Sequence, residues 1–188
     1  MDCIPTLYTR RLILTPLQLS DAAAVQQLFP QWEVVRYLDS RVPWPYPDDG
    51  GLVYVRDVAL PAMAAAKEWH WMIRTRVQPE SCIGSISLFD QPGNHRGFWL
   101  APQFQGNGYM REACKVINAY WFETLMRPLM QVPKAAANHA SRKISEDEGM
   151  RMVETRDGQF VSGPMPVEVC EITRSEWLAE ETNRSIDC

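Results

Sequence analysis

A glycine-containing turn between a strand and a long helix constrains this chain more than any other segment. The strand spans 96–100 (RGFWL), the turn contains Gly106, and the helix opens at about Gly108. Glycines at such a turn let a ligand approach the backbone, and a helix start offers unpaired N–H groups at a positive dipole end. The segment is therefore suited to bind phosphate or pyrophosphate, although a purely structural turn is the alternative. It lacks the GK[ST] of a Walker loop and the GxGxxG of a dinucleotide-binding unit.

The helix that follows is amphipathic and runs as far as Arg127-Pro128. Its apolar residues recur near the 3.6-residue period: Ala113, Val116, Ile117, Tyr120, Trp121 and Leu125. We expect the other strands at 11–17, 69–75, 82–89, 129–136, 151–156 and 167–173. Further helices are expected at 21–29, 31–38, 51–67 with a break at Pro61, 138–148 with Gly149 as its stop, and from Ser175 onward.

Prolines mark two irregular places in this order. Segment 41–51 (RVPWPYPDDGG) cannot be a regular element, because each proline removes a backbone donor and fixes φ. Pro133 indicates a bulge or an edge position for strand 129–136. Antiparallel hairpins dominate the order of elements, including one around the turn 157–166. The sequence therefore predicts an α+β fold rather than a doubly wound sheet.

Composition and charge narrow the class of protein. The chain has 188 residues, of which 46% are hydrophobic and 22% charged, so we expect one packed domain over residues 1–188. No stretch approaches the roughly 20 apolar residues of a membrane span. The formal net charge of −4 gives no basic footprint for nucleic acid, so neither membrane nor nucleic acid is an expected partner.

Cysteine usage predicts the compartment. The five cysteines are scattered without a CxxC pair and only three histidines occur, so we expect free thiols and no metal site. The first residues lack the pattern of a secretory signal, which together with the thiols predicts a cytoplasmic protein.

The segment QFQGNGYMREA resembles the acetyl-CoA pyrophosphate loop of the GNAT acetyltransferase superfamily, whose pattern is [Q/R]-x-x-G-x-[G/A]. The pattern fits in two registers, 103–108 and 105–110. The second corresponds to the QGxGYA form of the Rim-type ribosomal-protein alanine acetyltransferases and places the loop against the helix start. Met110 then replaces a small residue, and we expect it to crowd the pyrophosphate end.

Other segments are similar to the same Rim-type branch, from about Tyr8 to Trp177. They are TRRLILTPLQLSDA, the proline-tryptophan loop RVPWPYP, the segment from Asn138 to Met150, and the C-terminal hairpin SGPMPVEVCEITRSEW. The resemblance implies a GNAT fold, with a mixed, mainly antiparallel sheet flanked by helices and splayed where acetyl-CoA inserts. It also implies acetyl transfer to a primary amine by direct attack.

The resemblance further implies residues for the co-substrate, acetyl-CoA. The backbone of Trp99, Leu100 and Ala101 would pair with the pantetheine arm. The pyrophosphate would lie on Gln105, Gly106, Asn107, Gly108, Tyr109 and Met110. Asn138 would bond the pantetheine, and Ser141 would protonate the leaving thiolate as a general acid. Capping of the helix is the alternative for both Asn138 and Ser141.

A general base is harder to find in the sequence. Many relatives have a carboxylate about two residues before the glycine of the fourth strand, and His95 occupies that position here. Histidine is an adequate base, and an exposed loop histidine is the alternative. Glu168 and Glu171 are three apart in a strand and so lie on opposite faces, which leaves only one of them able to face a cleft.

The sequence says least about the residues that bind the acetyl acceptor. Four aromatic residues could line it or form a packed lid: Trp32, Tyr37, Trp44 and Tyr46. A peptide N-terminal α-amine is the first expectation for the acceptor. The alternatives are a small-molecule amine, amino acid or antibiotic, or a non-catalytic acyl-CoA-binding protein. A strand edge near Pro133 or the C-terminal hairpin would suit a homodimer.

Overall fold

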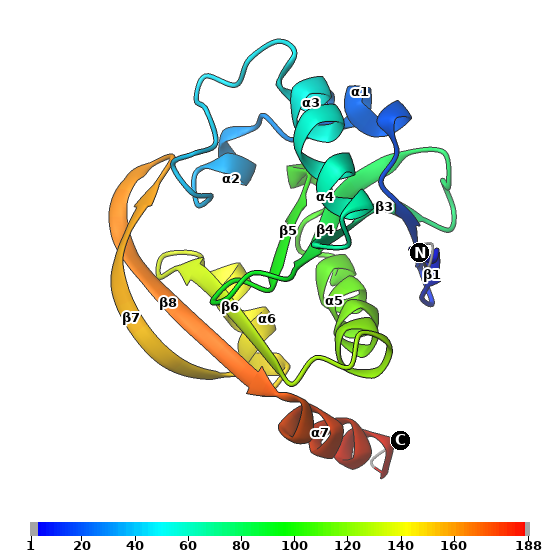
Figure 1. Ribbon diagram of the computed structural model, residues 1–188, viewed down its shortest axis with the longest axis vertical. Coiled ribbons are helices and arrows are strands. Elements are labelled where there is room, and N and C mark those ends of the chain that lie inside the picture. Colours follow the sequence, from blue (N-terminus) through cyan, green and yellow to red (C-terminus); the bar gives the residue numbers. More distant parts are fainter. Residues whose placement is uncertain (1–3, 187–188) are drawn as a thin grey trace.

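The computed structural model describes residues 4–186, and its strands form two separate sheets (Figure 1). The larger sheet has the order β1-β2-β3-β4-β5, formed by β1 (Leu7–Tyr8), β2 (Leu12–Pro16), β3 (Glu68–Thr75), β4 (Cys82–Phe89) and β5 (Arg96–Leu100). The smaller has the order β6-β8-β7, formed by β6 (Leu129–Ala135), β7 (Arg151–Phe160) and β8 (Gly163–Thr173). Neighbouring strands pair antiparallel in both sheets, and helices flank them, as an α+β fold requires.

The helices connect these strands in the expected order. On the N-terminal side lie η1 (Leu19–Asp21), α1 (Ala22–Leu28), α2 (Trp32–Val35), α3 (Gly50–Val53), η2 (Tyr54–Ala59) and α4 (Leu60–Ala64). After β5 come η3 (Pro102–Phe104), α5 (Tyr109–Ala119), η4 (Tyr120–Thr124), α6 (His139–Asp147) and α7 (Arg174–Ile186). No helix of the described residues is long and apolar enough to cross a membrane.

The larger sheet is covered on both faces, and alternation along β3 shows why. Trp71 and Ile73 belong to the core cluster that contains Ile117 of α5. Met72, between them, belongs to a second cluster with Val55 of η2. Successive strand residues point to opposite faces, so one face is buried by α5 and the other by α1 and η2.

Two expectations about elements need correction. The helix expected at 51–67 is three segments, and its middle part, η2, is π-helical and lies just before Pro61. The segment 157–166 is not a loop, because β7 continues to Phe160 and β8 begins at Gly163. The backbone of Pro166 faces β6, as its carbonyl accepts from Ala136 N–H, and Pro164 has the same parity. Their missing donors therefore cost no bond to β7.

The two sheets meet at one point and are bridged at another. At the junction, His95 N–H donates to Gln131 C=O (2.8 Å), and Gln131 N–H donates to Nδ1 of His95 (2.8 Å). At the far end, the tip of the β7–β8 hairpin pairs with the segment 36–40 after α2, where Val161 N–H donates to Leu38 C=O (3.0 Å). In Figure 1 this hairpin arches from α7 to the region of α2.

Candidate active site

The facing edges of β5 and β6 carry backbone groups that their own sheets do not use. Ala101 N–H donates to Ile83 C=O (3.0 Å), and antiparallel bonding alternates, so the groups of Phe98 and Leu100 point away from β4. The carbonyl of Leu100 accepts from the Gln105 side chain (2.9 Å). By the same parity, Trp99 and Ala101 turn their N–H groups toward β4. The free edge of β5 is thus formed at Phe98 and Leu100.

Pro133 lies on the opposing edge, as the sequence predicts. Ala136 N–H bonds to Pro166 of β8, so even-numbered residues of β6 face β8 and odd-numbered ones face β5. Pro133 therefore directs a nitrogen without hydrogen toward β5, where a donor would find no ladder partner. Beyond the His95–Gln131 junction, the two edges can accept an extended ligand between them.

The turn after β5 leads to the start of α5, close to that edge. Gly106 and Gly108 both have φ of +75°, and Gly108 is the N-cap of α5. Such a φ favours glycine, because a Cβ would clash with the following carbonyl. In the first helical turn, the N–H groups of residues 109–111 lack an intrahelical acceptor and can donate to an anion. This geometry favours the register 105–110 over 103–108.

Met110 corrects one expectation about this loop. Its side chain is only 7% exposed and lies in the main core cluster with Ala113 and Ile117. It therefore points away from the exposed turn and does not crowd it. Only its backbone N–H remains available at the helix start.

Arg11 holds the turn in place, and nothing in its neighbouring sequence indicates this role. Its guanidinium donates to Asn107 C=O (2.9 Å) and to Glu112 (2.6 Å), and it lies over the ring of Tyr109, 4.7 Å from the centroid. Burial raises the pKa of Glu112, but hydrogen bonds from Thr9 and Arg11 outweigh it and lower the pKa overall. Arg11 therefore ties the start of β2 to the turn and to the first turn of α5.

Asn138 and Ser141 lie at the start of α6, after β6. The side chain of Asn138 accepts from Ser141 N–H (3.2 Å), which is the capping arrangement. Ser141 is buried in the first turn of the helix. Capping does not use the Ser141 hydroxyl, so its role as an acid remains a prediction.

His95 is held in a way that limits it as a base. Its Nδ1 accepts the Gln131 N–H, so the neutral ring carries its proton on Nε2 and has no free lone pair. The ring also packs against Trp121, 5.1 Å between centroids. Burial lowers the pKa of His95; Asp90 raises it and Arg127 lowers it further. In this arrangement His95 can accept a proton only by breaking the bond that joins the sheets.

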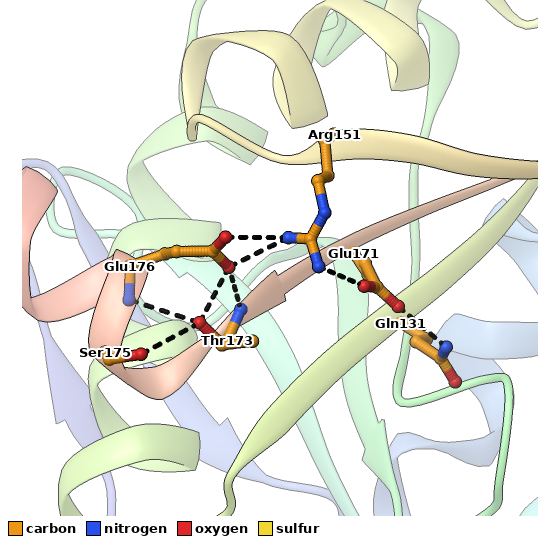
Figure 2. A network of polar contacts seen from close by, with 6 residues as sticks. All are labelled: Gln131, Arg151, Glu171, Thr173, Ser175 and Glu176. Carbon is orange, nitrogen blue, oxygen red and sulfur yellow. Dashed lines mark hydrogen bonds and ion pairs between the residues drawn. The ribbon is translucent and has the colours of Figure 1, made fainter.

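The two hairpin glutamates lie on opposite faces of β8, and each meets an arginine. Glu168 forms an ion pair with Arg142 of α6. Glu171 pairs with Arg151 and accepts from the Gln131 side chain (2.9 Å). Figure 2 shows Arg151 linking Glu171 to Glu176 at the start of α7. Each of these two carboxylates is thus already engaged by a guanidinium.

The four candidate acceptor residues lie along the chain between α2 and α3. Trp32 and Trp44 contact each other with centroids 5.7 Å apart and are 43% and 44% exposed. Tyr46 packs edge-on against Phe29, which in turn contacts Trp99 of β5. Tyr37 is covered by the guanidinium of its neighbour Arg36 (4.6 Å). Tyr46 is thus connected to β5 through Phe29, while Trp32 and Trp44 offer open aromatic surface.

A buried ion pair joins β5 to the end of α6, and a hydrogen bond extends it to α5. Both terminal nitrogens of Arg96 donate to Glu148, at 2.9 and 2.8 Å, and one also donates to Asn118 (2.6 Å). These residues come from β5, the end of α6 and α5. Sequence analysis missed them, since the three are up to 52 positions apart.

Among the described residues no group of three or more His, Cys, Asp or Glu side chains could hold a metal ion. Cys82, Cys114 and Cys170 are free, and burial raises the pKa of the Cys114 thiol to about 12. Cys3 and Cys188 lie outside the described residues.

Comparison with known proteins identifies the fold. The family model described as an acetyltransferase (GNAT) domain matches residues 11–151. A Bacillus subtilis protein provisionally named ribosomal N-acetyltransferase YdaF is 33% identical over 88 residues, which cover 44% of this chain and 48% of that protein. The match thus spans about half the length of this curated relative.

Two solved structures share the architecture almost end to end. One is RimL, a ribosomal L7/L12 α-N-protein acetyltransferase in complex with coenzyme A, at 16% identity and a TM-score of 0.75 over 90% of this chain and 97% of that one. The other is a Vibrio cholerae spermidine N-acetyltransferase with CoA and spermine, at 17% identity and a TM-score of 0.75 over 90% and 99%. At this identity the likeness concerns the fold.

Proposed function

Because the chain belongs to the GNAT acetyltransferase family, we propose that it transfers the acetyl group of acetyl-CoA to a primary amine. The observation that carries the proposal is the pairing of two features at one end of β5. The left-handed glycine turn opens α5 with free N–H groups, and the adjacent β5 edge at Phe98 and Leu100 forms no ladder with another strand. The first suits a pyrophosphate and the second suits the amides of a pantetheine arm.

The chain's own groups supply the rest of the reaction by direct attack, without an acetyl-enzyme. The two substrates are positioned between β5 and β6, which lowers the entropic part of the barrier. An N–H of the free β5 edge, from Phe98 or Leu100, donates to the carbonyl oxygen as negative charge develops there. Asn138 holds the start of α6, and the Ser141 hydroxyl supplies a proton to the leaving sulfur.

For the acceptor we propose the N-terminal α-amine of a protein or peptide. Trp32 and Trp44 offer an exposed apolar surface on which a small first side chain can pack. On the same segment Asp39 is bonded to Arg41 (2.8 Å), which leaves fewer carboxylates for a polycation. A small amine such as spermidine is the second candidate, favoured by the structural neighbour that binds spermine and by the two adjacent carboxylates of Asp48 and Asp49. Further proposals are a cytoplasmic location and a homodimer.

The test is titration calorimetry with acetyl-CoA, followed by an assay of released CoA with an N-terminal alanine peptide and with spermidine. We expect micromolar binding and turnover of the peptide. Gly108→Ala should weaken acetyl-CoA binding at least tenfold, because it strains the start of α5. Gly93→Ala, with a similar φ of +79° and nothing within 4 Å of the added Cβ, is the matched control and should leave binding unchanged. Binding without turnover of any amine would favour a non-catalytic acyl-CoA-binding protein.

A further inference from the structure

Three polar side chains, those of Glu68, His70 and Ser87, form a line across β3 and β4. Nδ1 of His70 lies 2.7 Å from Oγ of Ser87, and Nε2 lies 2.6 Å from Oε2 of Glu68. His70 is 1% exposed and Ser87 is buried, whereas the Glu68 side chain is 27% exposed. The line therefore connects the interior of the sheet to solvent.

The chemistry of the three groups fixes where the protons are. A carboxylate next to Nε2 accepts the ring proton, so Nδ1 carries the lone pair and accepts the hydroxyl proton of Ser87. An oxygen held in this way is polarised by the base beside it, which in turn is oriented by the carboxylate. The Ser87 oxygen keeps its own lone pairs for a further donor.

The line lies on the face of the sheet that carries Trp99, whose ring contacts Phe29, the neighbour of Tyr46. Ser87 is paired with Gly97 of β5 and shares its face, and Trp99 lies two residues further along that face. Phe89 packs against His70 (5.8 Å) and would contact any side chain at position 97 (3.1 Å). The Ser87 end therefore lies beside the strand whose opposite edge is proposed to bind acetyl-CoA.

The Glu68 end reaches the acceptor loop through Tyr54. The ring of Tyr54 lies edge-on to His70, 6.3 Å between centroids. Burial raises the pKa of Tyr54, and the charges of Glu68 and Tyr46 raise it further. Tyr54 and Glu68 are the titratable groups that these contacts place against His70. Tyr46, on the proline-rich loop, has its ring 2.7 Å from where a Cβ of Gly50 would lie, and the Gly50 carbonyl accepts from Tyr54 N–H.

The other candidate bases near β5 and β6 already take part in hydrogen bonds or ion pairs. His95 uses its lone pair to accept the Gln131 N–H. Glu168 and Glu171 are each paired with an arginine. Glu68, by contrast, accepts from the ring of a histidine, which can pass on a proton.

We propose that Ser87, His70 and Glu68 form a proton relay that removes the proton of the attacking amine. The inference rests on the proposed acetyl transfer. Directly or through one water, the Ser87 oxygen takes a proton from the amine nitrogen while its own proton moves to Nδ1 of His70. The Nε2 proton moves to Glu68, whose carboxyl group releases it to solvent. One proton crosses the line and leaves the ring protonated on Nδ1. The first tautomer returns when a solvent proton passes through Glu68 to Nε2 and the Nδ1 proton leaves through Ser87 to water in the emptied acceptor site. Ser87 is the catalytic residue. His70 orients the Ser87 hydroxyl and accepts its proton, and Glu68 passes the proton on to solvent.

Ser87→Ala tests the relay, with Ser85→Ala as a matched control. Both serines are buried on the same face of β4, but the Ser85 hydroxyl donates to Trp71 C=O (2.9 Å) and touches no titratable group. With the N-terminal alanine peptide, or spermidine if that is the amine turned over, we expect Ser87→Ala to lower kcat about 100-fold. KM for acetyl-CoA should stay within twofold, and Ser85→Ala should keep kcat within threefold of wild type. Equal kcat in the two variants would overturn the relay.

Glu68→Gln provides a second variant in case Ser87→Ala folds poorly. It keeps an oxygen near Nε2 but cannot hold the proton, so kcat should again fall at least tenfold. The loss should shrink as the pH is raised toward the pKa of the free amine, because the amine then arrives without its extra proton. A loss independent of pH would indicate a structural role and overturn the relay. Wild-type protein that binds acetyl-CoA but acetylates neither amine would instead overturn the proposed function.

Discussion

At the scale of single residues, His95 has a property that pH can test. Burial lowers its pKa in the folded state, so the unfolded chain binds a proton more readily. The free energy of unfolding should then fall as the pH falls below about 6.5, the ordinary pKa of imidazole. A proton on Nδ1 would also oppose the donation from Gln131 N–H.

We therefore expect His95→Asn to flatten this pH dependence, because the amide can accept from Gln131 but does not titrate in this range. Urea denaturation at about pH 7 and pH 5 measures the effect. His139→Asn, at an exposed position, is the control and should keep the wild-type slope. The same variant addresses the predicted base role: retention of most activity would exclude it, and equal slopes in all three proteins would contradict the bridging role.

Residue roles could be predicted from sequence where they depend on local spacing. Asn138 caps α6 and Gly149 follows its end with a φ of +80°, both readable from neighbouring residues. Met110 precedes Ala113, Cys114 and Ile117 by three, four and seven positions, so the helical period already placed it in the core. Matching the loop motif obscured that signal. Arg11 could not be found, since its partners are about 100 positions away.

At the scale of elements, the buried group of Arg96, Asn118 and Glu148 joins β5 to α5 and α6. Glu148→Ala would leave the Arg96 charge buried without its counter-ion. Removing one partner of such a pair costs about 3–5 kcal/mol, so we expect a loss of that size in the free energy of unfolding. Glu146→Ala, at an exposed site of the same helix, should change it by less than about 0.5 kcal/mol. Urea denaturation compares the two, and similar small losses would show that the pair contributes little.

Most helices and strands could be predicted from the hydrophobic periodicity of the sequence and from the glycines and prolines that end them. The exceptions have a common cause, which is contact with parts of the chain that are distant in sequence. Strand 96–100 is found where expected because it is apolar and bounded by polar turns. The β7–β8 hairpin is longer than expected because Pro164 and Pro166 direct their nitrogens away from β7, which sequence alone does not show. The π-helical segments η2 and η4 depend likewise on packing against the sheet.

At the scale of the whole molecule, the two sheets meet at the junction of β5 and β6, and the β7–β8 hairpin adds a second connection to the segment after α2. We call this closed arrangement the ring. The tip of the hairpin pairs with the segment that follows α2: Ser162 Oγ donates to Arg36 C=O (2.6 Å), and Ser40 N–H donates to Gln159 C=O (3.0 Å). The sequence could not predict this contact, because the partners lie about 120 positions apart and both are in polar, irregular stretches. The hydrogen bonds of the hairpin tip reach the segment between Trp32 and Trp44 and not the turn at Gly106.

This separation predicts that shortening the hairpin affects the two substrates differently. Gly158 pairs with Met165, so replacing residues 159–164 by Asn-Gly joins them through a two-residue turn and preserves the strand register. The bonds to Arg36, Leu38 and Ser40 are lost, and the acceptor segment is released. We expect KM for the amine to rise about tenfold, while Kd for acetyl-CoA stays within twofold.

A milder variant separates the contact from the length of the hairpin. Replacing only Val161 and Ser162 by Asn-Gly keeps the strands and Gln159 C=O but removes the Ser162 hydroxyl, so KM for the amine should rise by less. Steady-state kinetics and calorimetry on both variants decide the matter. A parallel loss of acetyl-CoA binding would mean that the hairpin supports the whole gap between the sheets, and an unchanged KM for the amine would place the acceptor outside the ring.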